Sequence, residues 1–176
     1  MSAFNPRVAR WLAFLTKALV SVCLLANLFG WFIPEAAETI ARNITTLITE
    51  PISLTTRALV LGGLISTVQL GILTIGFWAM AAVFKLFAQG DYLHPDIGKQ
   101  VQCFGKSLAL FGVLSPLMRT LLALVITLDN PEGQQILMIR LVTNDFVIIL
   151  VGMLLIMLGY ALKQAAMIAE ENRQIV

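Results

Sequence analysis

Four long runs of apolar residues dominate the sequence, and polar residues gather in the segments between them. The runs cover residues 11–33, 58–87, 107–128 and 146–168. Each run is long enough to cross a hydrocarbon core of about 30 Å, which takes about 20 apolar residues. None of them alternates apolar and polar positions as a barrel strand does, and a backbone in lipid must satisfy its own hydrogen bonds. The pattern therefore predicts an all-α polytopic membrane protein with four transmembrane helices.

The polar segments between these runs form one hairpin and two loops. The hairpin covers residues 88–106, and the loops cover residues 34–57 and 129–145. In the first loop Pro34 suits the first turn of a helix, and Ile40, Ile44 and Leu47 fall on one helical face. This spacing predicts a short amphipathic helix lying at the outer membrane interface. Because no repeat or low-complexity linker interrupts the chain, we expect a single transmembrane domain over residues 1–176.

Composition agrees with a membrane protein, and the distribution of charge predicts its orientation. The chain is 59% hydrophobic and 12% charged, whereas soluble domains carry about 25% charged residues. If the N-terminus is cytoplasmic, eight of the twelve basic residues lie on the inner side: Arg7, Arg10, Lys17, Lys85, Lys99, Lys106, Lys163 and Arg173. The positive-inside rule then places both termini in the cytoplasm. The net charge of +2 is too weak to indicate direct binding of nucleic acid.

Among the basic residues that fall within the apolar runs, Arg119 is the strongest candidate for a functional role. It follows Lys106 by thirteen residues, or about 20 Å along a helix, which places it in the outer half of the bilayer. Ionisable residues at this depth are costly and are candidates for function. Either the long side chain reaches the outer headgroups, or it pairs with Asp145 or Gln69 of a neighbouring helix. A buried pair of this kind fixes helix packing or binds an anionic lipid.

The second apolar run carries a face of small residues. Gly63, Thr67, Gly71 and Thr74 recur at spacings of four, four and three. Small residues let helix backbones approach closely in lipid, where helices gain no hydrophobic driving force from association. We therefore expect this face to pack against another helix.

No arrangement of residues typical of catalysis or metal binding is present in the sequence. Cys23 and Cys103 are far apart and lack neighbouring histidines, and the single histidine, His94, stands between Asp91 and Asp96. One histidine with two nearby carboxylates is weak evidence for a metal, and His94 before Pro95 also suits the start of a helix. We expect no catalytic residues, no metal and no cofactor, so the protein is predicted not to be an enzyme.

Two segments of the sequence resemble a known family. The stretch FAQGDYLHPDIGKQVQCFGKSL follows the second apolar run, and the last run ends in YALKQAAMIAEENRQIV. Together they resemble bacterial membrane proteins of domain-of-unknown-function family 2975, over roughly residues 75–176. Gly90, Gly105, Glu171, Asn172 and Val176 match family-like positions, whereas residues 93–96 depart from the family pattern. The resemblance implies a four-helix protein of the bacterial inner membrane, and members are often associated with small helix-turn-helix regulators.

These observations lead to one functional hypothesis and two alternatives. We expect a non-enzymatic inner-membrane protein that acts through protein contacts at its cytoplasmic face, as a sensor, an anchor or an accessory subunit. The residues expected to dock a partner are Asp91, His94, Asp96, Lys99, Glu170, Glu171 and Arg173. The first alternative is a small transporter or channel, which has to form a homo-oligomer because four helices with few polar groups enclose little space. The second is a membrane-embedded enzyme that uses Arg119 and His94.

Overall fold

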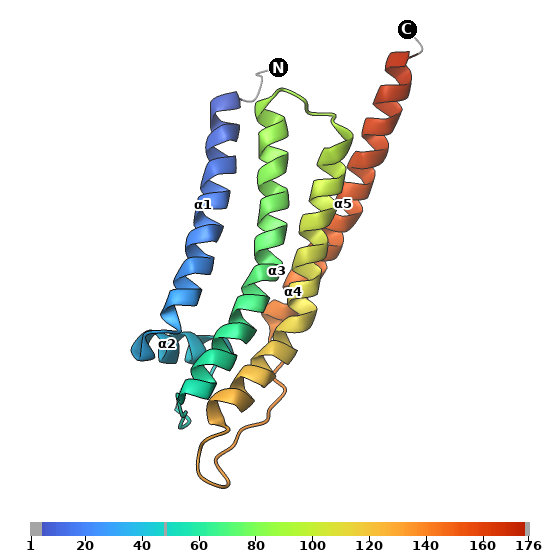
Figure 1. The fold of residues 1–176 in the computed structure, drawn as a ribbon. Coiled ribbons are helices and arrows are strands. Elements are labelled where there is room, and N and C mark those ends of the chain that lie inside the picture. Colours follow the sequence, from blue (N-terminus) through green and yellow to red (C-terminus); the bar gives the residue numbers. More distant parts are fainter. Residues whose placement is uncertain (1–4, 48, 175–176) are drawn as a thin grey trace.

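The computed structural model describes residues 5–47 and 49–174, and their regular structure is entirely helical (Figure 1). The five helices are α1 (Pro6–Gly30), α2 (Pro34–Thr45), α3 (Thr56–Ala88), α4 (Pro95–Thr127) and α5 (Thr143–Gln174). The helices α1, α3, α4 and α5 are each long and apolar enough to cross a membrane. The prediction of an all-α protein with four such helices is therefore confirmed.

Local signals in the sequence explain where the long helices begin. The side chain of Asn5 accepts a hydrogen bond from the Arg7 N–H at the start of α1, and Thr55 accepts one from the Ala58 N–H at the start of α3. Pro95 occupies the first turn of α4, and His94 precedes it as the capping residue. These side chains satisfy backbone donors that have no partner within the first turn of a helix. Each start is therefore fixed by residues next to it in sequence.

The helix α4 begins twelve residues before the apolar run of residues 107–128, at the Pro95 that suits a helix start in the sequence. It starts at Pro95 rather than at residue 107, and the connection from α3 is reduced to residues 89–94. Gly90 in this connection has a φ of 81°, a conformation that glycine adopts at little cost. The predicted hairpin at residues 88–106 is therefore mostly helix. With 33 residues each, α3 and α4 are about 50 Å long and exceed the thickness of a hydrocarbon core.

The long helices pack in the order in which they follow along the chain. The helix α1 packs on α3, α3 packs on α4, and α4 packs on α5. Within the described residues, no other pair of long helices shares more than marginal contact. The result is a row of four helices, with α1 and α5 at opposite edges (Figure 1). Both termini and the connection between α3 and α4 lie at one end of the row, and α2 crosses the other end.

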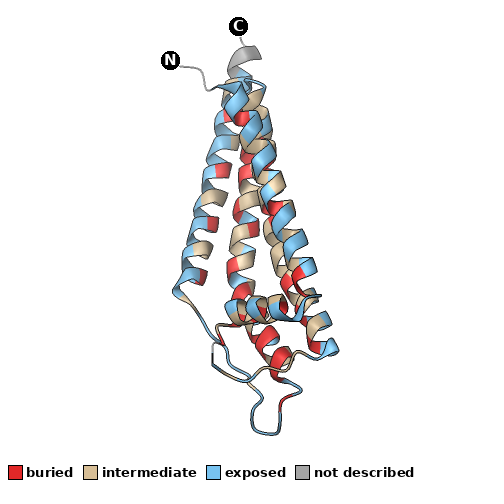
Figure 2. Ribbon diagram, turned by 90° about the vertical axis from the view of Figure 1, so that its left-hand side faces the viewer, coloured by how far each residue is buried: buried red, intermediate tan, exposed pale blue. Residues whose placement is uncertain are grey.

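The short helix α2 closes a small apolar core at its end of the row. Ala37 and Ala41 of α2 are fully buried and pack in one cluster with Trp31, Leu122 and Ile126. The apolar side of α2 thus rests on α1 and α4, while its other side stays exposed (Figure 2). Burial of a few side chains of this size contributes several kcal/mol in total. Contact with the rest of the protein therefore determines where α2 lies.

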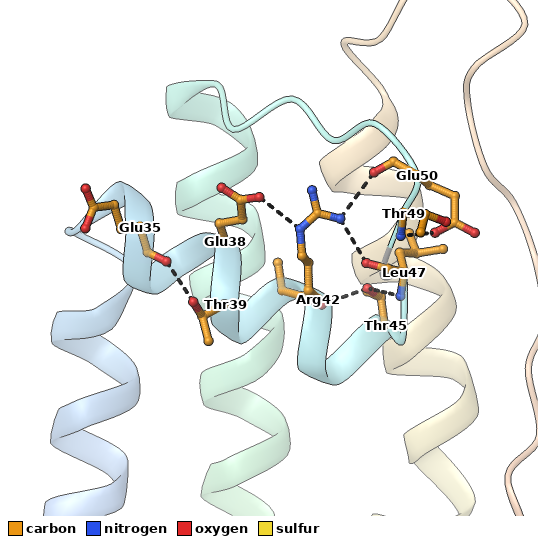
Figure 3. A network of polar contacts seen from close by, with 9 residues as sticks. Glu35, Glu38, Thr39, Arg42, Thr45, Leu47, Thr49 and Glu50 are labelled. Atoms are coloured by element: carbon orange, nitrogen blue, oxygen red, sulfur yellow. Dashed lines mark hydrogen bonds and ion pairs between the residues drawn. The ribbon is translucent and has the colours of Figure 1, made fainter.

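Arg42 ties α2 to the chain that follows it (Figure 3). Its Nε lies 2.9 Å from Glu38 Oε1, and its Nη1 donates to the carbonyl oxygens of Leu47 at 3.1 Å and Glu50 at 3.2 Å. The helix ends at Thr45, and the next residue, Thr46, adopts a left-handed conformation with a φ of 60°. The guanidinium of Arg42 therefore holds the loop segment that contains Leu47 and Glu50 against the end of α2.

Glycines of α4 and α5 bring these two helices into contact through their backbones. We call this contact the glycine seam, and it comprises Gly98, Gly105, Gly112, Gly152 and Gly159. A Cβ atom on Gly105 would lie 2.7 Å from the carbonyl oxygen of Gly152, and one on Gly98 would lie 2.6 Å from that of Gly159. Both distances are too short for a side chain. The glycines of the seam recur at a spacing of seven residues on both helices, a pattern that was not among the predictions from the sequence.

The small residues predicted on the second run lie on α3, and three of the four face α1 or pack within the protein. Gly63 contacts Trp31, because a Cβ there would lie 3.3 Å from Trp31 Cγ. Thr67 accepts a hydrogen bond from Asn27 at 3.1 Å, and Thr74 is buried. Gly71 differs, since a Cβ atom on it would meet nothing within 4 Å. The expectation of close packing at Gly71 is therefore wrong.

Candidate functional site

The most deeply buried charges among the described residues are Arg119 of α4 and Asp145 of α5. The side chain of Arg119 is 13% exposed and that of Asp145 is 5% exposed. The guanidinium faces the carboxylate with both terminal nitrogens, at 3.1 Å and 3.2 Å. Such a two-pronged pair is strong and directional because the fork of arginine matches the carboxylate. Of the alternatives considered for Arg119, the structure therefore shows the pair with Asp145.

The segment before α5 completes the surroundings of this pair. Arg119 donates to the carbonyl oxygen of Arg140 at 2.7 Å, and Asp145 accepts from the Val142 N–H at 3.1 Å. Arg140 in turn donates to Thr46 at the end of α2. Charges removed from water need such hydrogen bonds to offset their lost hydration. The pair and its partners fasten α4, α5 and α2 together, which is a structural role.

The remaining polar groups inside the row form two further contacts between helices. Gln69 of α3 donates to Ser115 of α4 at 2.9 Å, and Arg119 donates to Asp145 instead of to the amide oxygen of Gln69. Asn27 of α1 donates to Ser66 and Thr67 of α3, each at 3.1 Å. Each hydrogen bond of this kind between helices in a membrane contributes about 0.6 kcal/mol to the free energy of unfolding. They therefore act as contacts between neighbouring helices.

At the opposite end of the row, the predicted docking residues of the hairpin surround the first turn of α4. His94 Nδ1 accepts a hydrogen bond from the Asp96 N–H at 3.1 Å. The carboxylate of Asp96 lies 2.7 Å from Lys99 Nζ. Asp91 is exposed in the connection that precedes them. His94, Asp96 and Lys99 thus interact mainly with one another, and His94 serves as a helix cap.

The end of α5 extends beyond the start of α4. Gly98 of α4 lies against Gly159 and Lys163 of the antiparallel α5, so Pro95 is level with about Ala166. The eight residues from Met167 to Gln174 therefore extend past α4 by about 12 Å, as Figure 1 shows.

This projecting end combines apolar and acidic side chains. Met167 and Ile168 are 45% and 58% exposed, and Glu170 and Glu171 are also exposed. The side chains of Asn172 and Arg173, and the whole of Val176, lie outside the described residues. The predicted docking residues Glu170 and Glu171 thus stand on the stretch of α5 that extends past the start of α4.

No group of three metal-binding side chains comes together in the part of the chain that the structure describes. His94 has Asp96 Oδ2 at 3.6 Å. Cys23 and Cys103 are free thiols in that part of the chain.

The chain matches no protein family, no curated protein and no solved structure. The resemblance to family 2975 therefore stays a prediction.

Proposed function

We propose that this chain is a multi-pass protein of a bacterial inner membrane that acts, without catalysis, through protein contacts at its cytoplasmic face. The observation that carries this proposal is the projecting end of α5, which is apolar on Met167 and Ile168 and acidic on Glu170 and Glu171. Apolar anchors rimmed by charge are typical of protein-binding surfaces. Because this end of α5 extends past the start of α4, the exposed Met167 and Ile168 are accessible to a partner.

The lipid bilayer is the second partner in this proposal. Large apolar side chains in the middle of α5 are strongly exposed, among them Leu150 at 61%, Leu154 at 67% and Met157 at 68%. Exposed apolar patches of this extent require a lipid or protein cover. The crossing direction of α2 at the other end (Figure 1), and its exposed residues Glu35, Thr39 and Asn43, support a place for α2 at the outer membrane interface.

A small helix-turn-helix regulator is the partner that we favour at the cytoplasmic face. The resemblance to family 2975 supports this choice, and so does the acidic character of Glu170 and Glu171, which suits a basic nucleic-acid-binding protein. The chain itself then holds the regulator at the membrane and binds no nucleic acid.

A photo-crosslinking residue placed at Ile168 tests the proposed contact in intact cells. We expect a covalent adduct with a different protein, because Ile168 is exposed on the projecting end of α5. The matched control carries the same residue at Leu154, which is exposed in the middle of the same helix and should face lipid. Electrophoresis followed by mass spectrometry identifies the adducts.

Three results of this experiment would count against the proposal. A protein adduct at Leu154 with none at Ile168 would move the contact surface into the membrane. An adduct with a second, differently tagged copy of the chain would favour the oligomeric transporter or channel. Absence of a protein adduct at both positions would leave the bilayer as the only partner.

The proposed orientation makes a separate prediction. In a chain with Cys23 and Cys103 replaced by Ser, a cysteine at the exposed position Thr49 should react with a membrane-impermeant thiol reagent in intact cells. A cysteine at the exposed Tyr92 should react only after the cells are permeabilised, because the positive-inside rule places that end in the cytoplasm. Labelling of Tyr92→Cys but not of Thr49→Cys in intact cells would reverse the orientation.

A further inference from the structure

The first turns of α1 carry two arginines and two aromatic rings on one face. Arg7, Arg10, Trp11 and Phe14 line an open pocket of about 510 Å³. Their spacing of three and four residues keeps them on one side of the helix. The rings of Trp11 and Phe14 meet edge to face, with centroids 6.2 Å apart and an angle of 86° between their planes. The two arginines thus lie about one helical turn from the two aromatic rings.

The arginines of this pocket have no acidic partner in the described structure. Neither Arg7 nor Arg10 forms an ion pair among the described residues, and the first acidic residue of the whole sequence is Glu35. Lys17 adds a third exposed cation farther along α1. Lys99 at the same end differs, since it pairs with Asp96. The positive charge of Arg7 and Arg10 can therefore pair with an anionic group from outside the described chain.

The arrangement of the helices keeps the acidic groups of α5 away from this pocket. Because α1 and α5 are the two edges of the row, Glu170 and Glu171 lie at the far side of the same end (Figure 1). The end that carries both termini is thus basic at the α1 edge and acidic at the α5 edge. Only the packing order of the helices separates these charges, which would otherwise attract one another.

We propose that Arg7 and Arg10 bind the phosphate of an anionic phospholipid, and that the part of its acyl chains next to the headgroup contacts Trp11 and Phe14. This inference rests on the proposed membrane location and names a ligand of that end. Arginine suits phosphate because its planar fork donates several hydrogen bonds at once. Tryptophan and phenylalanine next to these cations lie where headgroups give way to hydrocarbon. Phosphatidylglycerol carries a net negative charge and fits this site, whereas zwitterionic phosphatidylcholine does not.

Quenching of Trp11 fluorescence by brominated lipids tests the site in the full-length chain. The protein is reconstituted in vesicles that contain brominated phosphatidylglycerol or brominated phosphatidylcholine at equal mole fraction. The difference between the wild type and Trp11→Phe isolates the signal of Trp11 from Trp31 and Trp78. We expect stronger quenching by phosphatidylglycerol, and the double variant R7Q/R10Q should lower this preference by up to about 30-fold. The preference should also fall at high salt.

The control variant is Lys85→Gln, which removes an exposed charge from α3 at the same end and should keep the preference. Equal quenching by the two lipids in the wild type, or an undiminished preference in R7Q/R10Q, would overturn the site. Loss of the preference on adding inorganic phosphate at constant ionic strength would assign the site to a soluble anion instead of a lipid. Absence of quenching by either lipid would overturn the lipid site together with the membrane location itself, while adducts at Ile168 test the protein contact independently.

Discussion

Replacing Arg119 with Leu is expected to lower the free energy of unfolding by about 3–5 kcal/mol. The substitution leaves the carboxylate of Asp145, which is 5% exposed, without its guanidinium partner. It also removes the hydrogen bond to the Arg140 carbonyl oxygen. Titration with a denaturing detergent in mixed micelles, followed by helix content and by cooperativity, measures the change.

The control for this prediction is Arg57→Leu. The ion pair of Arg57 with Asp129 has a separation of 3.9 Å and side chains that are 67% and 31% exposed. Such an exposed pair contributes about 0–1 kcal/mol. Equal effects of the two substitutions would mean that Arg119 reaches the outer headgroups and makes no buried pair in solution.

The double variant R119L/D145N separates loss of the pair from loss of a helix contact. Asparagine keeps an oxygen for the Val142 N–H and carries no charge. Much of the stability lost in Arg119→Leu should return, because the largest part of that loss is the cost of an unpaired buried charge. Failure to recover any stability would show that the packing of the long arginine side chain dominates.

Replacing Gly152 with Ala is expected to destabilise the protein by about 1–3 kcal/mol. The added Cβ would lie 2.6 Å from the backbone nitrogen of Ala109 and 2.8 Å from the carbonyl oxygen of Gly105. Because both contacts are backbone atoms, neither can rotate away, and α4 and α5 have to separate. The same detergent titration measures the loss.

Gly71→Ala is the matched control for Gly152→Ala. Both glycines lie inside long helices, and alanine favours a helix over glycine by about 1 kcal/mol at each position. A Cβ on Gly71 meets nothing within 4 Å, so this substitution should be neutral or slightly stabilising. If Gly152→Ala is as harmless as Gly71→Ala, the close approach of α4 and α5 in the structure is wrong.

The sequence predicted the four long helices because each depends on local properties. Length and apolar content identify a segment that can cross a bilayer, and nearby residues mark its ends. Pro95 and Asp96 indicated the start of α4 even though the apolar run begins at residue 107. Hydropathy by itself marks only residues 107–128, because the first turns of α4 carry Lys99, Gln100 and Gln102, which lower the hydropathy of this part of the helix.

The contacts between helices could be predicted only in part. The candidates for a partner of Arg119 included Asp145, but the choice between Asp145, Gln69 and the outer headgroups required the position of α5 relative to α4. The small residues of α3 follow spacings of three and four, which mark one face of a single helix, whereas a spacing of seven along α4 and α5 places glycines two turns apart and is a weaker signal of contact. A run of small residues also does not reveal which of them faces lipid, as Gly71 shows.

By itself the sequence determined the class of the protein, the number of long helices and the polar segments that connect these helices. These features follow from the free energy of placing each segment in water or lipid, which depends on that segment alone. Only the tertiary structure decided that the helices form a row, that glycines join α4 to α5, and that the cations of α1 and the acids of α5 stand at opposite edges. Those features depend on the fit between surfaces that are distant in sequence, and four helices of similar hydropathy admit many packing orders.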